Sequence, residues 1–270
     1  MADGGIMHRQ RILSALLLIP LFLLLVQYGS LIHFRLLIGL AIGLAAWEFS
    51  RLCPVGTDRA LSCLTVAGAL GWYGASVWAD TLAGLLPLLA CTALLRAALL
   101  PGEFRVGVLQ GGWMVLGVAY VGGLLGFASL LRDLNDGRQL IFYLAFTTWA
   151  GDTGAYYVGS RLGRRPLCPR ISPRKTVEGA VGGIAATILL GVAGSVWVWP
   201  RLPWGRAAVV GLILAISGIA GDLCESAVKR AASAKDSGGI IPGHGGVLDR
   251  LDSVMFAGPV LYALIWIGWV

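Results

Sequence analysis

Nine runs of mostly apolar residues follow one another along the chain and constrain its fold more than any other feature. Each is close to the length of about 20 residues that a helix needs to cross the apolar core of a bilayer. The runs cover residues 12–28, 31–48, 60–79, 81–100, 107–131, 139–157, 177–199, 205–223 and 253–270. The sequence therefore predicts an all-α, polytopic integral membrane protein with about nine transmembrane helices.

The composition supports lipid as the solvent of these helices. Hydrophobic residues make up 57% of the 270 residues and charged residues only 13%, against about 25% charged residues in a typical soluble domain. No small-x-small cleavage site follows the first run, so we expect a span there and not a signal peptide. Without repeats or low-complexity linkers, the chain is predicted to form one membrane domain over residues 1–270. We expect scaffold spans within 1–135 and catalytic spans and loops within 139–270.

Lysine and arginine residues predict the orientation of the chain. If nine spans are threaded through a membrane, one side receives sixteen of the 21 Lys and Arg residues and the other side receives five. Positive residues are retained on the cytoplasmic side. This predicts a multi-pass protein of the cell (inner) membrane, with the N-terminus and the 224–252 loop in the cytoplasm. The net charge of +7 thus reports orientation, and we expect no nucleic-acid partner.

Acidic residues at the ends of apolar runs are candidates for function. Asp152 lies in a G-D-T-G-A-Y stretch and Asp222 in A-G-D-L, both toward the predicted cytoplasmic ends of their runs. A charge at the centre of a membrane costs about 2.5–3.5 kcal/mol, so it usually has a function or a partner. A functional carboxylate and one paired with a neighbouring arginine both remain open. For Glu48, at the end of the second run, an interfacial anchor and a functional role are equally compatible with the sequence.

A basic segment over 161–176 precedes the seventh run. Its six Lys and Arg residues favour an anchor for anionic lipid head groups. The stretch S-P-R-K-T at 172–176 adds a compatible interpretation, because lysine and hydroxyl groups at the start of a helix can hold phosphate. Glu178 could instead complete an N-cap pattern there.

The segment 221–253 holds the largest number of candidate site residues. Asp222, Glu225, Ser226 and Lys229 are spaced i, i+3, i+4 and i+7, which places them on one face of a helix. Asp249 and Asp252 open the last run, after a glycine-rich stretch whose backbone N–H groups can turn toward an anion. Carboxylates, basic residues and a glycine-rich turn together indicate Mg²⁺-dependent chemistry on phosphates.

The same segment resembles the signature of the phosphatidate cytidylyltransferases, also called CDP-diacylglycerol synthases. That signature reads S-x-hydrophobic-K-R, then K-D, then a glycine-rich turn with H-G-G, then D-R-hydrophobic-D. The stretches at 151–156 and 172–176 also resemble the family, in the expected order, whereas the part of the chain before position 131 resembles it only in composition. The signature residues here are Ser226, Lys229, Arg230, Lys235, Asp236, His244, Gly245, Gly246, Asp249, Arg250 and Asp252.

The resemblance implies a nucleotidyltransferase that converts CTP and phosphatidate into CDP-diacylglycerol and pyrophosphate for phospholipid synthesis. It implies Mg²⁺, leaves a second monovalent or divalent cation open, and implies a homodimer embedded in membrane lipid. Carried onto this sequence, the metal ligands are Asp222 and Asp249, and the catalytic residues are Asp152, Asp222, Lys229 and Asp249. The implied substrate-binding residues are Ser172, Lys175, Thr176, Ser226, Arg230, Lys235, Asp236, His244, Gly245, Gly246, Arg250 and Asp252.

Two other classes of protein fit parts of the pattern. One is a related membrane lipid kinase or nucleotidyltransferase with another lipid acceptor, and the other is an ion-coupled transporter that uses Asp152 and Asp222. The long charged loop at 224–252 argues against a transporter, and the complete signature favours the cytidylyltransferase. A site that joins a lipid to CTP belongs at head-group level, so we expect a cavity among the sixth, seventh and eighth spans that opens to the cytoplasm and to lipid.

Overall fold

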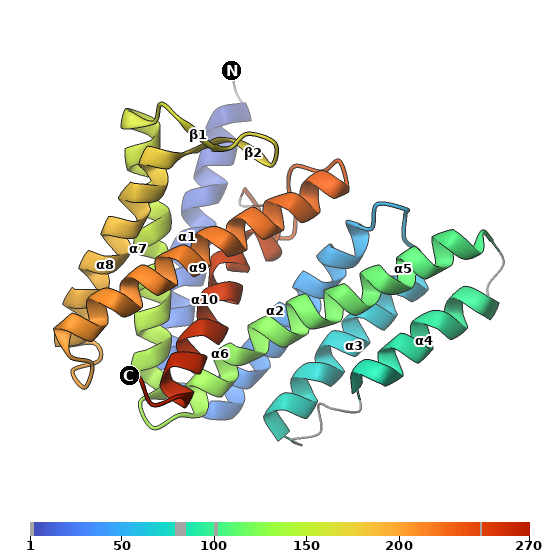
Figure 1. The fold of residues 1–270 in the computed structure, drawn as a ribbon, viewed down its shortest axis with the longest axis horizontal. Helices are drawn as coiled ribbons and strands as arrows, with labels where there is room; N and C mark the ends of the chain where they lie inside the picture. The colour runs from blue at the N-terminus through green and yellow to red at the C-terminus, as the bar shows by residue number, and fades with distance from the viewer. Residues whose placement is uncertain (1–2, 79–84, 100–101, 244) are drawn as a thin grey trace. The chain divides into compact units, whose positions relative to one another are not determined.

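The computed structural model describes residues 3–78, 85–99, 102–243 and 245–270, and almost all of its regular structure is helical (Figure 1). In chain order the elements are α1 (Asp3–Tyr28), α2 (Leu31–Arg51), α3 (Arg59–Trp78), α4 (Leu85–Leu99), α5 (Phe104–Gly117), the π-helix η2 (Val118–Gly123), α6 (Leu124–Asp133), α7 (Gly137–Leu162), β1 (Pro166–Cys168), β2 (Ser172–Thr176), α8 (Val177–Trp197), α9 (Trp204–Ala231) and α10 (Leu248–Trp266).

The helices agree with the predicted class of a helical membrane protein. Within the described residues, five are long and apolar enough to cross a membrane, namely Leu31–Arg51, Arg59–Trp78, Phe104–Asp133, Val177–Trp197 and Trp204–Ala231. The other four apolar runs also coincide with helices (α1, α4, α7 and α10), but these are shorter or more polar. The count of about nine spans is therefore not confirmed. Large apolar side chains such as Leu189, which is 71% exposed, fit a surface in contact with lipid.

The chain divides into two compact units. The first unit comprises residues 1–129 and 228–250, and the second comprises 130–227 and 251–270. The chain passes from one unit to the other inside α6, α9 and α10. The division near position 130 lies close to the predicted boundary between scaffold and catalytic spans, but the signature segment 228–250 belongs to the same unit as segment 1–129.

Within the first unit, aromatic packing fixes the end of α2. The Phe49 ring stacks on the Trp113 ring with 4.9 Å between centroids, and Trp113 Nε1 donates a 3.0 Å hydrogen bond to the Phe49 carbonyl. A Cβ atom at Gly117 would lie only 2.6 Å from the Phe49 ring, so glycine is required for this approach. The π-helix η2 begins at the next residue.

Within the second unit, glycines bring α7 and α8 into close contact. A Cβ atom at Gly151 would lie 2.6 Å from Thr187 Oγ1, and one at Gly154 would lie 2.6 Å from the Ala186 Cβ. These glycines flank Asp152 in the sequence, and small residues allow helix backbones to approach closely in a membrane. Part of the G-D-T-G-A-Y motif therefore serves helix packing.

The basic loop before α8 contains a structure that the sequence did not predict. Strands β1 and β2 form a small antiparallel hairpin in which Pro166 faces Thr176 and Cys168 faces Ser172. Thr176 is the N-cap of α8, and its Oγ1 accepts a 3.1 Å hydrogen bond from the Gly179 N–H. Glu178 is thus not the capping partner, since its Oε2 accepts hydrogen bonds from the backbone N–H groups of Arg164 and Arg165 at 2.9 and 3.1 Å.

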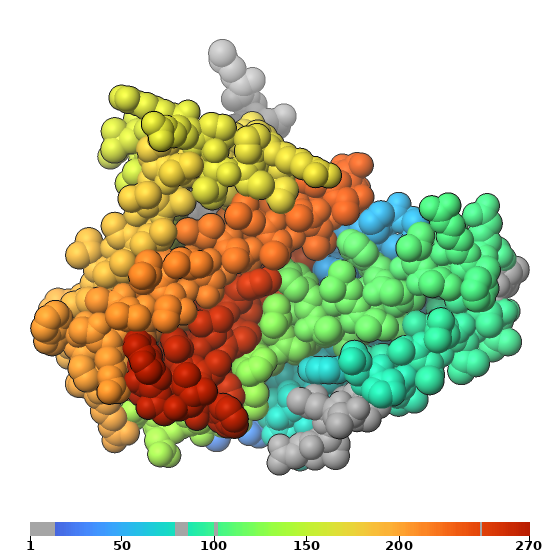
Figure 2. Space-filling model, viewed as in Figure 1, coloured from blue at the N-terminus to red at the C-terminus, as the bar shows by residue number. Residues whose placement is uncertain are grey.

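The hairpin displays its arginines on the surface of the second unit. It forms part of the face that is in view in Figure 2, where it is coloured yellow. The exposed basic side chains are those of Arg161, Arg164, Arg165, Arg170 and Arg174. This surface is positively charged, as the lipid-anchor interpretation of the sequence requires.

Candidate active site

Three acidic side chains meet between α9 and α10 in the second unit. Asp222, Glu225 and Asp252 each offer a carboxylate oxygen, and these oxygens all lie within 4.8 Å of one another. Glu225 is fully buried, whereas Asp222 and Asp252 are partly exposed. We refer to these three residues as the acidic cluster.

The sequence around Gly221 explains why the acidic cluster forms. A Cβ atom at this position would lie 2.4 Å from the Asp252 carbonyl oxygen, so only glycine lets α9 approach α10 so closely. Asp222 follows directly, and Glu225 lies one turn later on the same helix face. The predicted i, i+3 spacing therefore places both carboxylates beside Asp252.

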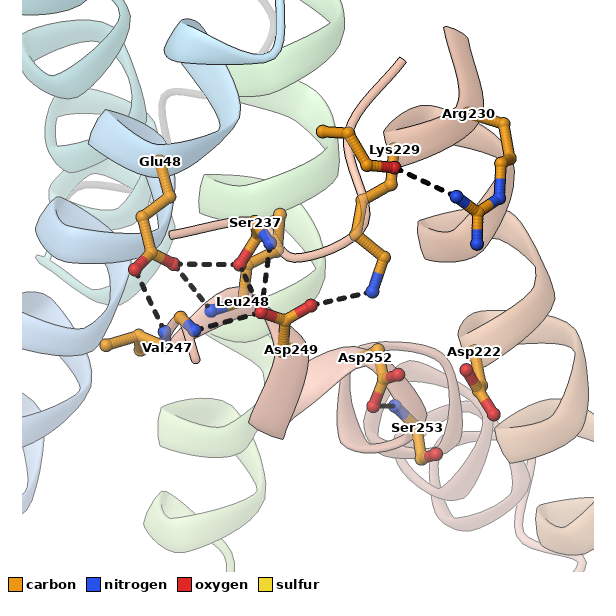
Figure 3. A network of polar contacts seen from close by, with 12 residues as sticks. Glu48, Asp222, Lys229, Arg230, Ser237, Val247, Leu248, Asp249, Asp252 and Ser253 are labelled. Carbon is orange, nitrogen blue, oxygen red and sulfur yellow. Dashed lines mark hydrogen bonds and ion pairs between the residues drawn. The ribbon is translucent and has the colours of Figure 1, made fainter. Parts of the chain in front are cut away.

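Lys175 and Asp152, which were both predicted as site residues, border the acidic cluster. The Lys175 ammonium at the end of β2 lies 2.5 Å from Asp222 Oδ2. Ser253 links α7 to α10, because its Oγ donates to Asp152 Oδ1 at 3.4 Å and its N–H donates to Asp252 Oδ1 at 2.7 Å. Figure 3 shows Asp222, Asp252 and Ser253. The predicted site residues Asp152, Lys175 and Asp222 thus lie around one group of carboxylates.

The acidic cluster has the donor chemistry of a magnesium site. Like charges this close repel one another, and a divalent cation with oxygen ligands offsets that repulsion. Carboxylate oxygens are the protein ligands that Mg²⁺ uses, together with substrate phosphates and water. Of the two predicted metal ligands, Asp222 belongs to the cluster. Its neighbours there are Asp252, predicted to bind substrate, and Glu225, which the sequence placed on the same helix face without a role.

The other predicted ligand, Asp249, lies in a dense set of polar contacts in the first unit (Figure 3). Its Oδ1 lies 2.6 Å from the Lys229 ammonium. Its Oδ2 accepts hydrogen bonds from Ser237 N–H, Ser237 Oγ and Gly246 N–H at 3.0, 2.9 and 2.9 Å. Both carboxylate oxygens therefore have donors from the protein itself, and metal binding by Asp249 stays a prediction.

The remaining predicted site residues lie on α9, in the segment between α9 and α10, at the start of α10 or, for Ser172, in β2. Arg230 donates to the Ala234 carbonyl at 3.1 Å and thereby supports the end of α9. Gly243 and Gly245 have φ angles of +74° and +84°, a backbone conformation that glycine adopts without strain. Ser226 is buried, Ser172 is partly exposed, and Lys235, Asp236 and Arg250 are exposed. His244 lies outside the described residues, so its predicted role stays a prediction.

One residue of this region was left undecided by the sequence. Glu48 at the end of α2 is only 2% exposed, and its carboxylate accepts hydrogen bonds from Ser237, Val247 and Leu248. An interfacial anchor would be exposed to solvent and head groups, so that interpretation of Glu48 is wrong. The sequence signal for Glu48 was an acidic residue at the end of an apolar run. Its hydrogen-bond partners lie 189 to 200 positions later in the chain.

Comparison with known proteins places the chain in a family. A family model described as "Cytidylyltransferase family" matches residues 9–268. The chain belongs to this family. A phosphatidate cytidylyltransferase from Bacillus subtilis (strain 168) is 35% identical over 275 residues, covering 95% of this chain and 97% of that relative. One from Pseudomonas aeruginosa is 35% identical over 272 residues, covering 97% and 99%.

These matches confirm the resemblance that the signature residues indicated. They also extend it, because similarity to the cytidylyltransferases covers the N-terminal half of the chain, where only the composition had suggested it. The N-terminal helices are thus part of the family's common sequence and not an unrelated scaffold.

Proposed function

We propose that this protein transfers the cytidylyl group of CTP to phosphatidate and releases pyrophosphate. The observation that carries the proposal is the acidic cluster, with the Lys175 ammonium 2.5 Å from Asp222. Carboxylates for a cation and a lysine for phosphate are the groups that phosphoryl chemistry requires. The name shared by relatives that match nearly the whole chain supports CTP and phosphatidate as the substrates.

We propose Mg²⁺ as the cofactor of this reaction. Asp222, Glu225 and Asp252 would hold it, and metal binding by Asp249 stays a separate prediction. When bound, Mg²⁺ supplies positive charge that stabilises the phosphates of CTP and the departing pyrophosphate. A second cation remains compatible with the number of carboxylates.

The chain's own residues are expected to bring two anionic substrates together. The second pKa of a phosphomonoester is about 6, so phosphatidate is largely ionised at pH 7 and needs no strong general base. Its phosphate oxygen attacks the α-phosphorus of CTP, and pyrophosphate leaves. Lys175 and Lys229 would offset the charge of the phosphates, and Asp152 would hold Ser253 beside Asp252. The predicted substrate contacts of the other signature residues stay part of this proposal.

We propose that the reaction takes place at the cytoplasmic surface of the cell membrane. Phosphatidate keeps its acyl chains in lipid, whereas CTP arrives from water. The exposed arginines of the hairpin before α8 support a site at head-group level, because a basic residue near an anionic membrane contributes about 1 kcal/mol of attraction. We retain nine spans, a cavity open to lipid and a homodimer as parts of the proposal.

The decisive experiment uses purified protein, Mg²⁺, phosphatidate and CTP labelled at either the α- or the γ-phosphate. We expect a lipid-soluble product only from the α-label, and none after chelation of Mg²⁺ until the metal is restored. Label transferred from the γ-phosphate would instead indicate a lipid kinase. If neither label enters lipid, or another lipid replaces phosphatidate as acceptor, the proposed reaction is wrong.

The proposed orientation has a separate test. A cysteine at position 236, introduced after removal of the five native cysteines, should react with a membrane-impermeant reagent only in inverted vesicles or opened cells. Labelling of intact cells from outside would overturn the cytoplasmic placement of the 224–252 loop.

A further inference from the structure

The buried carboxylate of Glu48 is bound entirely within the first unit by the loop that carries the family signature. Its Oε1 accepts a hydrogen bond from the Val247 N–H at 3.1 Å. Its Oε2 accepts one from the Leu248 N–H at 2.9 Å and one from Ser237 Oγ at 3.2 Å. Val247 and Leu248 stand at the start of α10, where backbone N–H groups have no partner within the helix. Glu48 therefore supplies the acceptors for the beginning of α10 (Figure 3).

Two signature-loop glycines make room for this carboxylate. A Cβ atom at Gly238 would lie 2.5 Å from Glu48 Oε1, and a Cβ atom at Gly246 would lie 2.5 Å from Glu48 Oε2. Neither glycine has a positive φ angle, so backbone conformation does not require them. Gly238 is required by the space that the Glu48 carboxylate occupies, whereas Gly246 leaves space for that carboxylate and for Ser237 Oγ, which would lie 2.0 Å from a Cβ atom at this position. Both glycines therefore have a role apart from phosphate binding.

The side chain of Glu48 is itself held in place by its neighbours on α2. Phe49 stacks on Trp113, and Ser50 Oγ donates a buried 2.9 Å hydrogen bond to Ser62 Oγ. The end of α2 is thus fixed against α3 and α5 by contacts that do not involve the signature loop. A rigid element presents the carboxylate, which favours a positioning role.

The contacts of Glu48 continue to the predicted catalytic residues through one serine. Ser237 Oγ lies 3.2 Å from Glu48 Oε2 and 2.9 Å from Asp249 Oδ2. Asp249 in turn pairs with Lys229. The two carboxylates therefore share the single hydroxyl hydrogen of Ser237, and the position of one depends on the other.

We infer that Glu48 is a positioning residue of the active site, which fixes Ser237 and residues 246–248 and through them the Asp249–Lys229 pair. The expected loss of kcat rests on the proposed function, whereas the expected role of Glu48 in the structure of the loop does not. It gives the N-terminal helices a task in catalysis: α2 supplies the charged group around which the signature loop folds.

The test replaces Glu48 with Gln and uses Glu103→Gln as the matched control. Glutamine keeps the size of the side chain but replaces one carboxylate oxygen by an NH₂ group, which then faces either the Val247 N–H or the Leu248 N–H and Ser237. Glu103 is exposed, and its side chain makes no capping hydrogen bond at the start of α5. Two measurements are made on each purified variant: hydrogen exchange of the amides at 247 and 248, and kcat per folded molecule with CTP and phosphatidate.

For Glu48→Gln we expect amide exchange at 247 and 248 to rise, and kcat per folded molecule to fall about ten- to a hundredfold, since buried donors lose their acceptor. Glu103→Gln should stay within about twofold of the wild type on both measurements, as is usual for exposed sites. Glu48→Asp, which keeps the charge, should recover part of the loss. Unchanged exchange, or a lower melting temperature with unchanged kcat per folded molecule, would overturn the inference.

A double substitution tests the same contact without relying on one variant. Gly238→Ala places a methyl group against the Glu48 carboxylate, so it should accelerate exchange at 247 and 248. In a Glu48→Ala background the same methyl group meets no carboxylate, and Gly238→Ala should add less than about twofold. Full additivity of the two effects would contradict the inference. If the wild type makes no CDP-diacylglycerol, the proposed function fails, while the exchange measurements still decide the role of Glu48 in the loop.

Discussion

The two units of this protein each contain predicted metal ligands, but they treat carboxylates in opposite ways. In the first unit, Asp249 receives an ammonium group and three hydrogen-bond donors. In the second unit, three carboxylates gather within 4.8 Å, with Lys175 beside Asp222. The first arrangement neutralises negative charge with the protein's own groups, and the second accumulates it.

This difference separates stabilising carboxylates from carboxylates that serve a cation. A carboxylate that accepts several internal hydrogen bonds stabilises the fold, and its removal leaves buried donors without an acceptor. A cluster of like charges destabilises the fold in the absence of a cation, so its removal affects activity more than stability. Substitution of a carboxylate in the first unit should therefore lower stability, whereas substitution in the second unit should mainly lower activity.

Substitution of Asp222 should have the largest effect on activity. Asp222→Asn keeps the shape and removes the charge, so turnover of CTP and phosphatidate should fall about a thousandfold, comparable to the loss of a major electrostatic contact in other enzymes. The melting temperature in detergent should change little, because the loss of the Lys175–Asp222 ion pair is offset by the removal of one of three like charges. A variant that retains activity at limiting Mg²⁺ would contradict the metal assignment.

Substitution of Asp249 should lower activity and stability together. The Lys229 and Asp249 side chains are only 13% and 7% exposed, and removing one partner of a buried ion pair costs about 3–5 kcal/mol. Asp249→Asn should therefore melt at a markedly lower temperature, as followed by tryptophan fluorescence. If its stability is unchanged while Mg²⁺ dependence shifts, then Asp249 is mainly a metal ligand and the contrast between the units is wrong.

Substitution of Lys175 should have an intermediate effect that is confined to substrate binding. Lys175→Gln removes the ammonium next to Asp222, so we expect the KM for CTP or phosphatidate to rise tenfold, the equivalent of about 1.4 kcal/mol. Membrane insertion and melting temperature should change little. An unchanged KM for both substrates would show that Lys175 neutralises Asp222 but does not bind substrate.

Substitution of Glu178 should have the smallest effect. Its carboxylate accepts two backbone hydrogen bonds near an exposed segment, so Glu178→Gln should weaken only this local contact, because water competes for the same donors. Trypsin should then cleave after Arg164 a few times faster, with activity nearly unchanged; the bond after Arg165 is resistant because Pro166 follows it. Equal cleavage rates would show that the hairpin holds its shape without Glu178.

The sequence predicted most of the helices, and it singled out several acidic and basic residues that the structure brings together, although their roles stay predictions. Apolar run length identified the helices that the structure describes, because length and hydropathy are local properties. The glycines next to Asp152 and Asp222 permit close helix contacts that only the structure identifies. The small β1–β2 hairpin was missed because its strands are short and carry charged residues.

The partners of each acidic residue could not be predicted from spacing alone. The pattern at 222–229 placed Asp222 and Glu225 on one helix face, but it contained no information that Asp252 would join them. Likewise, nothing near Glu48 in the sequence indicated Ser237, Val247 or Leu248 as partners. These contacts depend on how distant helices pack, which a pattern in one segment does not record.

The contact between Glu48 and Leu248 joins residues that are 200 positions apart, which affects the order of biosynthesis. Glu48 enters the membrane with one of the first helices, whereas its donors are among the last residues to be translated. At about 5–20 residues per second, the ribosome needs roughly 10–40 s to make the intervening chain. Throughout that interval the carboxylate must remain in contact with water, head groups or the insertion machinery. Burial of Glu48 is therefore one of the last events in the maturation of this protein, and a nascent chain that ends before residue 247 lacks the donors for it.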